Sequence, residues 1–160
     1  MGKKTYIYGI GIIVLIGILY FLLSGNKASS FQTLNNYDGG IKMYKSLSCG
    51  CCEAYSSYFK GKGNSNIQII DINDIELIKN QNGVPEQLES CHTVIIGDYF
   101  VEGHVPLEAV EKLLVEKPDI KGIALPGMPE GSPGMLGNKQ EDFVIYAVNY
   151  DGSYQEFVRL

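Results

Sequence analysis

The cysteine and histidine residues of this 160-residue chain gather in one stretch of the sequence. All four cysteines and both histidines lie between Cys49 and His104, as the segment Cys49-Gly50-Cys51-Cys52, the pair Cys91-His92 and the single His104. A domain with no use for thiols would scatter its few Cys and His residues along the chain. The clustering therefore predicts one site that is built from distant segments, and we expect the function to lie there.

The first three cysteines are predicted to surround the N-terminus of a helix. The stretch from Cys49 to Lys60 has apolar residues at helical spacing and follows a short predicted strand, 41–45. Cβ bonds in a helix tilt toward its N-terminus, so the three sulfurs point into the space ahead of the helix. Free backbone N–H groups and the helix dipole favour thiolates there. Repulsion between thiolates so close is relieved either by a disulfide between Cys49 and Cys52 or by a bound cation.

Two methionines extend the candidate site. Met128 and Met135 lie seven residues apart in a loop rich in Gly and Pro, which suits folding over a soft metal ion. Thiolate, thioether and imidazole together select soft or borderline ions, Cu(I) above all. Zinc rarely uses Met, and C-x-C-C is not the spacing of a zinc ribbon or finger. We therefore predict a copper site with ligands drawn from Cys49, Cys51, Cys52, Cys91, His92, His104, Met128 and Met135.

Several of these residues also have a purely structural interpretation. Cys91 is small enough to be a buried apolar residue, and either histidine taken alone is as well suited to a hydrogen-bonded loop. The two methionines are equally able to fill an apolar gap. Glu102 and Glu130 are expected to be solvated.

The order of the predicted elements is that of a thioredoxin-like α/β domain. Strand, helix, strand, helix, hairpin and helix are predicted at 41–45, 49–60, 67–72, 74–80, 93–102 and 107–116. In that fold a redox pair lies at the N-terminus of the first helix, and Cys91 stands where a cis-proline usually faces the dithiol. A loop at 126–137 and a hairpin, 143–148 with 154–158, form a C-terminal extension of the minimal fold.

The N-terminal residues predict a membrane anchor. Thr5 to Ser24 contains no charged residue, and at about 1.5 Å per residue such a helix spans a hydrocarbon core of roughly 30 Å. A signal peptide is the competing interpretation, but the apolar run exceeds the roughly 7 to 15 residues of an h-region, and no good cleavage site follows. Lys3 and Lys4 keep the N-terminus cytoplasmic, which places the remainder outside. We expect an anchor at 1–24, a Ser- and Asn-rich linker at 25–38 and the metal-binding domain at 39–160.

Charge excludes one class of partner. The formal net charge is −5, and no cluster of Lys and Arg with interleaved aromatic residues occurs after the anchor, so we do not expect nucleic acid binding. The expected partners are copper ions, the membrane through residues 5–24, and other copper-handling proteins.

The motifs resemble those of the CopG-type copper-resistance proteins. The matching stretches are Tyr44-Lys45-Ser46 with Cys49-Gly50-Cys51-Cys52, Gly83-Val84-Pro85, Ser90-Cys91-His92-Thr93, Glu102-Gly103-His104-Val105-Pro106, Gly127-Met128-Pro129 and Gly131-Ser132-Pro133-Gly134-Met135. The resemblance implies a thioredoxin-like fold, an extracytoplasmic location and copper bound by the cysteine-rich site as a multinuclear Cu(I) cluster with redox activity. Two features depart from the family: Glu53-Ala54-Tyr55 replaces a basic residue and a Trp, and the anchor replaces a cleaved export signal.

A thiol-disulfide oxidoreductase is the alternative function. In that case Cys49, nearest the helix end, is the nucleophile and Cys52 resolves the mixed disulfide. Cys51 and Cys91 count against it, because a dithiol exchanger needs neither, and extra thiols beside the nucleophile trap it in unproductive disulfides.

Overall fold

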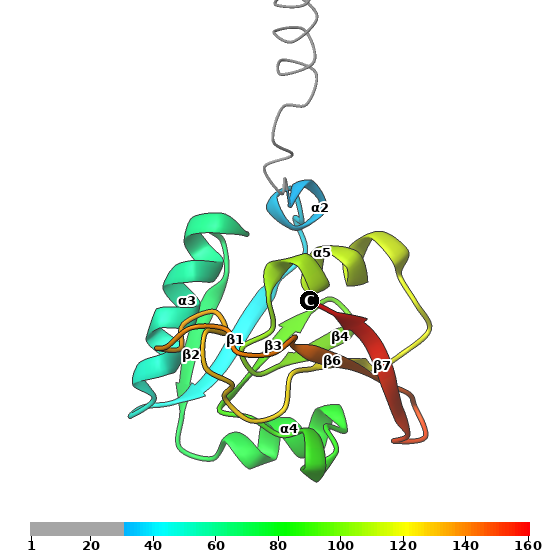
Figure 1. Ribbon diagram of the computed structural model, residues 1–160. Coiled ribbons are helices and arrows are strands. Elements are labelled where there is room, and N and C mark those ends of the chain that lie inside the picture. Colours follow the sequence, from blue (N-terminus) through cyan, green and yellow to red (C-terminus); the bar gives the residue numbers. More distant parts are fainter. Residues whose placement is uncertain (1–30) are drawn as a thin grey trace, which may run out of the picture. The chain divides into compact units, whose positions relative to one another are not determined.

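Seven strands form one mixed sheet in the computed structural model, which describes residues 31–160 (Figure 1). The order across the sheet is β2-β1-β3-β4-β5-β6-β7. The strands are β1 Ile41–Ser46, β2 Gln68–Ile72, β3 His92–Ile96, β4 Tyr99–Glu102, β5 Gly122–Ala124, β6 Val144–Val148 and β7 Tyr154–Arg159. The predicted α/β class is confirmed. Each strand expected from the sequence is present, and β5 is an additional one.

The helices are α2 Gln32–Asn35, α3 Gly50–Lys62, α4 Ile75–Asn82, the 3-10 turn η1 Glu86–Leu88 and α5 Leu107–Glu116. Local sequence signals mark both ends of α4 and the start of α5. Asp74 caps α4 by accepting a hydrogen bond from the Leu77 backbone N–H at 3.3 Å. Gly83 ends α4 with a left-handed backbone, φ +69°. Pro106 precedes α5, whose first turn needs no donor from it.

The C-terminal hairpin belongs to the main sheet. β1 pairs parallel with β2 and antiparallel with β3, and β3 and β4 form the predicted hairpin. β5 runs parallel to β4 and antiparallel to β6, so this strand joins the β6–β7 hairpin to the rest. With three residues, one of them Gly122, β5 is too short to give a periodic sequence signal.

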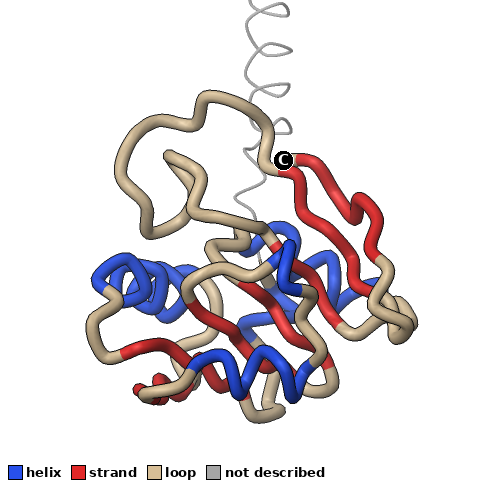
Figure 2. The backbone as a smooth tube through the Cα atoms, turned by 90° about the horizontal axis from the view of Figure 1, so that it is seen from below, coloured by secondary structure: helices blue, strands red, loops and turns tan. Residues whose placement is uncertain are grey.

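Helices cover both faces of the sheet (Figure 2). Along β3, Val94 and Ile96 point into the larger core with α3 and α5, whereas Ile95 points into a smaller core with Val84 and Leu88, just after α4. This alternation is the two-residue period of a strand buried on both faces. Successive residues of β3 therefore point to opposite faces of the sheet, one toward α3 and the next toward α4.

The folded unit reaches further toward the N-terminus than the expected start at residue 39. It begins at Phe31, and Phe31 and Leu34 are buried in the larger core. The Glu111 carboxylate of α5 accepts hydrogen bonds from the backbone N–H groups of Thr33 and Leu34, at 2.9 and 2.8 Å. Residues 31–38 of the expected linker therefore belong to the fold.

The expected anchor lies outside the described residues. Among the helices of residues 31–160, none combines the length and apolar character needed to cross a membrane.

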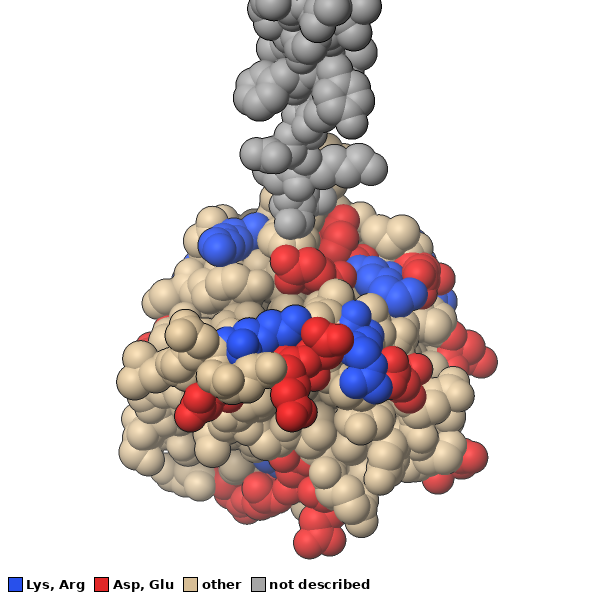
Figure 3. Space-filling view, in the orientation of Figure 1, with Lys and Arg blue, Asp and Glu red and all other residues tan. Residues whose placement is uncertain are grey.

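On the face shown in Figure 3, Lys and Arg side chains lie beside Asp and Glu side chains. Three exposed ion pairs of this kind are Lys112–Glu116, Lys139–Asp142 and Arg159–Glu156.

Candidate metal centre

The turn between β1 and α3 places three cysteines at one helix end. Cys49 is the N-cap residue with an extended backbone, φ −84° and ψ 91°, and Cys51 and Cys52 lie in the first turn of α3. The backbone N–H of Cys49 donates to the Ser46 carbonyl at the end of β1, at 3.3 Å. Cys49 and Cys52 form a disulfide, whereas Cys51 and Cys91 are free thiols. Of the two sequence alternatives for relieving thiolate repulsion, the structure therefore contains the disulfide.

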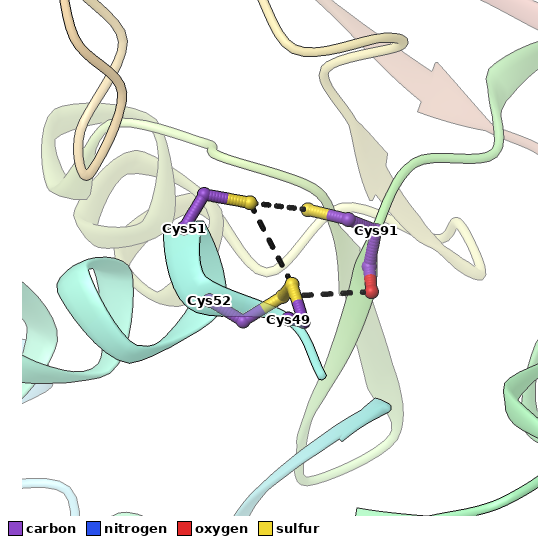
Figure 4. A group of neighbouring side chains, drawn as sticks. All are labelled: Cys49, Cys51, Cys52 and Cys91. Carbon is purple, nitrogen blue, oxygen red and sulfur yellow. Dashed lines mark hydrogen bonds between the residues drawn. A yellow bond between two sulfur atoms is a disulfide. The ribbon is translucent and has the colours of Figure 1, made fainter. Parts of the chain in front are cut away.

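Cys91 approaches this helix end from the facing segment, directly before β3. Its sulfur lies 3.8 Å from the Cys51 sulfur, which in turn lies 3.6 Å from the Cys49 sulfur. The sulfur of Cys52 is 3.6 Å from the Cys91 carbonyl oxygen. Figure 4 shows the sulfurs of Cys51 and Cys91 pointing toward each other above the disulfide. All four cysteine sulfurs lie within 4.8 Å of one another, a separation that one metal ion or a small cluster can bridge.

The two imidazoles meet the same thiol. The Cys91 sulfur is 3.0 Å from His104 Nε2 and 3.4 Å from His92 Nδ1. The ligand atoms of these three residues again lie within 4.8 Å of one another. Cys91 is therefore shared between an all-cysteine group and a Cys–His–His group, and the structure brings all six predicted Cys and His ligands together.

A carbonyl group fixes the proton of His104. His104 Nδ1 donates to the Pro133 carbonyl oxygen at 2.7 Å, because a carbonyl can only accept. Its Nε2 then presents a lone pair toward Cys91, which is the form of histidine that binds metals. His92 Nε2 is buried and has no hydrogen-bond partner among the described residues. The nitrogen of His92 that faces the cysteines is Nδ1, so Nδ1 is the atom placed to bind a metal ion beside Cys91.

Burial keeps both imidazoles neutral. It lowers the pKa of His104, and it lowers the pKa of His92 well below the usual value, where the neighbouring His104 and Lys79 act in the same direction. Burial also raises the pKa of the Cys91 thiol to about 12, with a further contribution from Cys51. The thiol is thus protonated at neutral pH in the metal-free protein, so metal binding at Cys91 must release a proton.

Tyr55 forms an aromatic wall behind the two histidines, and the sequence did not mark it as part of the site. Its ring centroid lies 4.5 Å from that of His92 and 5.5 Å from that of His104. Its hydroxyl donates to the Val105 carbonyl oxygen at 2.9 Å. The sequence pattern placed Tyr55 among the residues at helical spacing in this helix, and in the structure its side chain is fully buried on the inner face of α3. Its contact with both imidazoles depends on the positions of β3, which carries His92, and of the turn after β4, which carries His104.

The loop between β5 and β6 lies against the N-terminal turn of α3. Two of the loop's carbonyl groups accept hydrogen bonds from residues near the site: Gly127 from Ser90 Oγ at 2.5 Å, and Pro133 from His104 Nδ1 at 2.7 Å. Gly134 has φ +84°, and a Cβ at this position would lie 2.7 Å from the Tyr55 backbone nitrogen. This approach requires glycine.

The loop leaves its two methionines at different depths. Met128 is 52% exposed, and Met135, next to the close approach at Gly134, is half-buried. The described contacts do not test either residue as a ligand, so both thioether ligands stay predictions.

Three charged residues near the site are buried, and one of them was expected to be solvated. Glu102 was expected to be solvated, yet it is fully buried and forms an ion pair with the equally buried Lys79. Glu130 is exposed, as expected. Lys45 at the end of β1 pairs with Asp71 at 2.6 Å and with Glu53 of α3 at 2.7 Å. The Asp71 and Glu53 carboxylates raise the pKa of Lys45.

Comparisons with known proteins place the chain in a family. A family model described as "Protein of unknown function, DUF411" matches residues 88–135. A solved structure of "Copper resistance protein copG", form 1, is 34% identical over 76% of this chain and 96% of its own, with a TM-score of 0.69. Form 2 is 33% identical over 76% and 98%, with a TM-score of 0.70. Among curated proteins, no sequence matches significantly.

The predicted resemblance is thereby confirmed on two grounds. The identity extends over nearly the full length of the solved relatives, and the Cys and His motifs on which the resemblance rested converge at one site in the fold. The chain belongs to the CopG-type family of copper-resistance proteins.

Proposed function

We propose that this protein binds copper as Cu(I) and acts in copper handling and resistance. The observation that carries the proposal is the convergence of four cysteine sulfurs and two imidazoles on one helix end and one facing segment. Sulfur-rich sites of this kind select soft ions, and Cu(I) is the softest common candidate. The two solved relatives named as copper resistance proteins support the same metal.

The shared position of Cys91 supports a site with more than one copper ion. Its thiolate has lone pairs for two metal ions, and it belongs both to the cysteine group and to the Cys–His–His group. A single ion would leave some of the six converging ligands unused. We infer that thiolate bridges hold a small Cu(I) cluster, with Met128 or Met135 able to complete the coordination from the β5–β6 loop.

The disulfide between Cys49 and Cys52 supports coupled redox chemistry. These two cysteines become thiolate ligands only after the S–S bond takes up two electrons. Two Cu(I) ions would carry the required electrons, since two Cu(I) and one disulfide would give two Cu(II) and two thiolates, and the thiolates would then be available to hold further Cu(I). In this proposal the oxidation state of the cysteine pair and that of the copper are linked.

The sheet topology supports the thioredoxin-like part of the fold proposal. The first four strands have the order β2-β1-β3-β4, with β1 parallel to β2 and the hairpin antiparallel beside them. The disulfide lies at the N-terminus of the helix that follows β1. The β5–β6 loop is then the extension that covers the site.

In the same proposal, the N-terminal residues would hold the domain at the outer face of a membrane.

A thiol-disulfide oxidoreductase is the second candidate, and the Cys49–Cys52 disulfide is the observation that favours it. The close approach of Cys51 to Cys49 argues against it, because a thiol 3.6 Å from the disulfide competes with any substrate thiol. The two functions differ in their need for Cys51 and Cys91, which copper binding requires and dithiol exchange does not.

Metal competition tests the proposal. The full chain, reduced under anaerobic conditions in detergent, is titrated with Cu(I) and with Zn(II) in the presence of chelators of known affinity for each ion, followed by metal analysis. We expect a strong preference for Cu(I) and more than one equivalent bound. Preference for Zn(II), or binding of neither ion, contradicts the proposal. Disulfide exchange that survives Cys51→Ser and Cys91→Ser, together with unchanged copper binding, favours the oxidoreductase instead.

A further inference from the structure

A buried polar network lies on the face of the sheet opposite the cysteine cluster. His92 and Thr93 are neighbours in β3, and their side chains point to opposite faces, His92 toward Tyr55 of α3 and Thr93 toward Glu102 of β4. Glu102 Oε2 accepts from Thr93 Oγ1 at 2.6 Å. Its Oε1 pairs with Lys79 Nζ of α4. Lys79 and Glu102 are 1% and 0% exposed, so this ion pair is fully removed from water.

The network forms hydrogen bonds with the backbone of Ser90, the residue directly before Cys91. Glu102 Oε1 accepts from the Ser90 backbone N–H at 2.6 Å, and Lys79 Nζ donates to the Ser90 carbonyl oxygen at 2.7 Å. One carboxylate and one ammonium group thus hold both polar groups of a single peptide residue. The peptide bond that Lys79 holds is the one that joins Ser90 to Cys91.

The Ser90 side chain extends the same connection to the methionine loop. Its hydroxyl donates to the Gly127 carbonyl oxygen, one residue before Met128. Gly103, directly after Glu102, is also confined, because a Cβ there would lie 2.6 Å from the Leu125 carbonyl oxygen and 2.7 Å from Ser90 Cβ. Ser90 is therefore the junction between the buried ion pair, the Cys91 thiol and the loop that covers the site.

We propose that Lys79 and Glu102 are positioning residues that act through Ser90 to fix the Cys91 thiol, and with it the Met128 loop, at the copper site. The inference rests on the proposed copper function. Segment 83–91 contains only one short 3-10 turn, so the sheet ladder alone does not restrain Ser90 or Cys91. The ion pair supplies two charge-assisted hydrogen bonds to the backbone at that point, and these are stronger than neutral ones.

The first measurement needs no metal. In a Cys51→Ser background with the Cys49–Cys52 disulfide intact, Cys91 is the single free thiol, and its rate of alkylation by iodoacetamide reports how well it is held. Lys79→Met keeps the apolar stem but removes both donated hydrogen bonds. We expect faster alkylation of Cys91 in this variant than in the parent. Lys112→Met makes the same change in an exposed ion pair of α5, leaves the Ser90 contacts in place, and is expected to leave the alkylation rate at the parent value.

The second measurement is Cu(I) affinity in the reduced chain with all four cysteines present. Loss of an outer partner of a metal ligand costs about 10- to 100-fold in affinity, and we expect a loss of this size in Lys79→Met. Glu102→Gln nearly preserves shape and loses only the charge, so its effect should lie between wild type and Lys79→Met. It also keeps the test available if Lys79→Met does not fold. Ser90→Ala should lower affinity no more than Met128→Leu does.

Leu113→Ala is the stability control, because it opens a cavity in the core beneath α5 and leaves the Ser90 contacts in place. The proposal fails if Leu113→Ala, at a matched loss of melting temperature, changes Cys91 alkylation and copper affinity as much as Lys79→Met does. It also fails if both readouts in Lys79→Met and Glu102→Gln stay at parent values. If the wild-type chain binds no copper, the proposed function is wrong, whereas the alkylation rates still decide the positioning role.

Discussion

The two buried imidazoles predict that the metal-free protein loses stability in mild acid. Burial depresses the pKa of His92 and His104 in the folded state, whereas the unfolded chain titrates near the ordinary value of 6.5. A group whose folded pKa is depressed contributes stability above its unfolded pKa, and that stability is lost as the pH falls. The affected window therefore opens just above pH 6.5 and extends below it.

The size of the effect follows from the protons that only the unfolded state takes up. A histidine of pKa 6.5 passes from about one-tenth to about nine-tenths protonated between pH 7.5 and 5.5. A folded side chain that stays neutral throughout, as the pKa of His92 well below the usual value implies, makes this range cost about 1.4 kcal/mol. His104 adds a smaller loss of the same sign. Glu89 and Glu102 act in the opposite direction, because burial raises the pKa of each carboxyl. The difference between wild type and a histidine variant is therefore the decisive quantity.

Urea unfolding at pH 7.5 and at pH 5.5 measures that difference. The chain has no tryptophan, so far-ultraviolet circular dichroism of the full chain in detergent, with a chelator present, is the signal. His92→Gln should lose about 1.4 kcal/mol less than wild type between the two pH values, and His104→Gln, whose imidazole is less deeply buried, should lose less than wild type by a smaller amount. Tyr55→Phe, which alters the same aromatic cluster without removing an imidazole, should lose as much as wild type. The reasoning is refuted if the glutamine variants lose as much stability as the wild-type chain.

Three further outcomes are expected. Single Ser substitutions in the cysteine cluster should each sharply lower the number or affinity of bound Cu(I) ions, and Met128→Leu and Met135→Leu should weaken binding less. Met43→Leu, the same change in the core, should not weaken it. Equal losses for all of these variants in a Cu(I) competition titration would contradict the ranking. A membrane-impermeant thiol reagent should label the reduced metal-free protein on intact cells, and labelling only after lysis would place the domain inside. Gly134→Ala should push the β5–β6 loop away from α3, because its Cβ has no space beside Tyr55; faster proteolysis of the loop is the expected sign, and wild-type protease resistance would argue against the contact.

Local signals explain why so much of the site was predictable. Three cysteines within four residues at a strand-to-helix junction must share one helix end, whatever the rest of the chain does. The prediction that Cys91 faces them followed from the order of strands and helices, and the sulfur of Cys91 lies 3.8 Å from that of Cys51. The starts of α4 near Asp74 and of α5 after Pro106 followed from local signals, whereas the predicted end of α4 at residue 80 falls two residues short of the observed end at Asn82.

Contacts between distant segments decided the rest. The expectation that Glu102 is solvated was wrong, because the strand period gives the face of a side chain but not what covers that face, and here Lys79 of α4 does. The three residues of β5 pair with neighbours on both sides, a tertiary property that no local pattern encodes.

The state of the two histidines shows the division most clearly. The sequence determined that His92 and His104 lie near the cysteines, through the order of the elements that carry them. Tertiary packing brings in the Pro133 carbonyl from a loop 29 residues away, which accepts a hydrogen bond from His104 Nδ1 and leaves Nε2 facing Cys91. Protonation depends on burial and on such partners, and both arise only when segments far apart in the chain pack together.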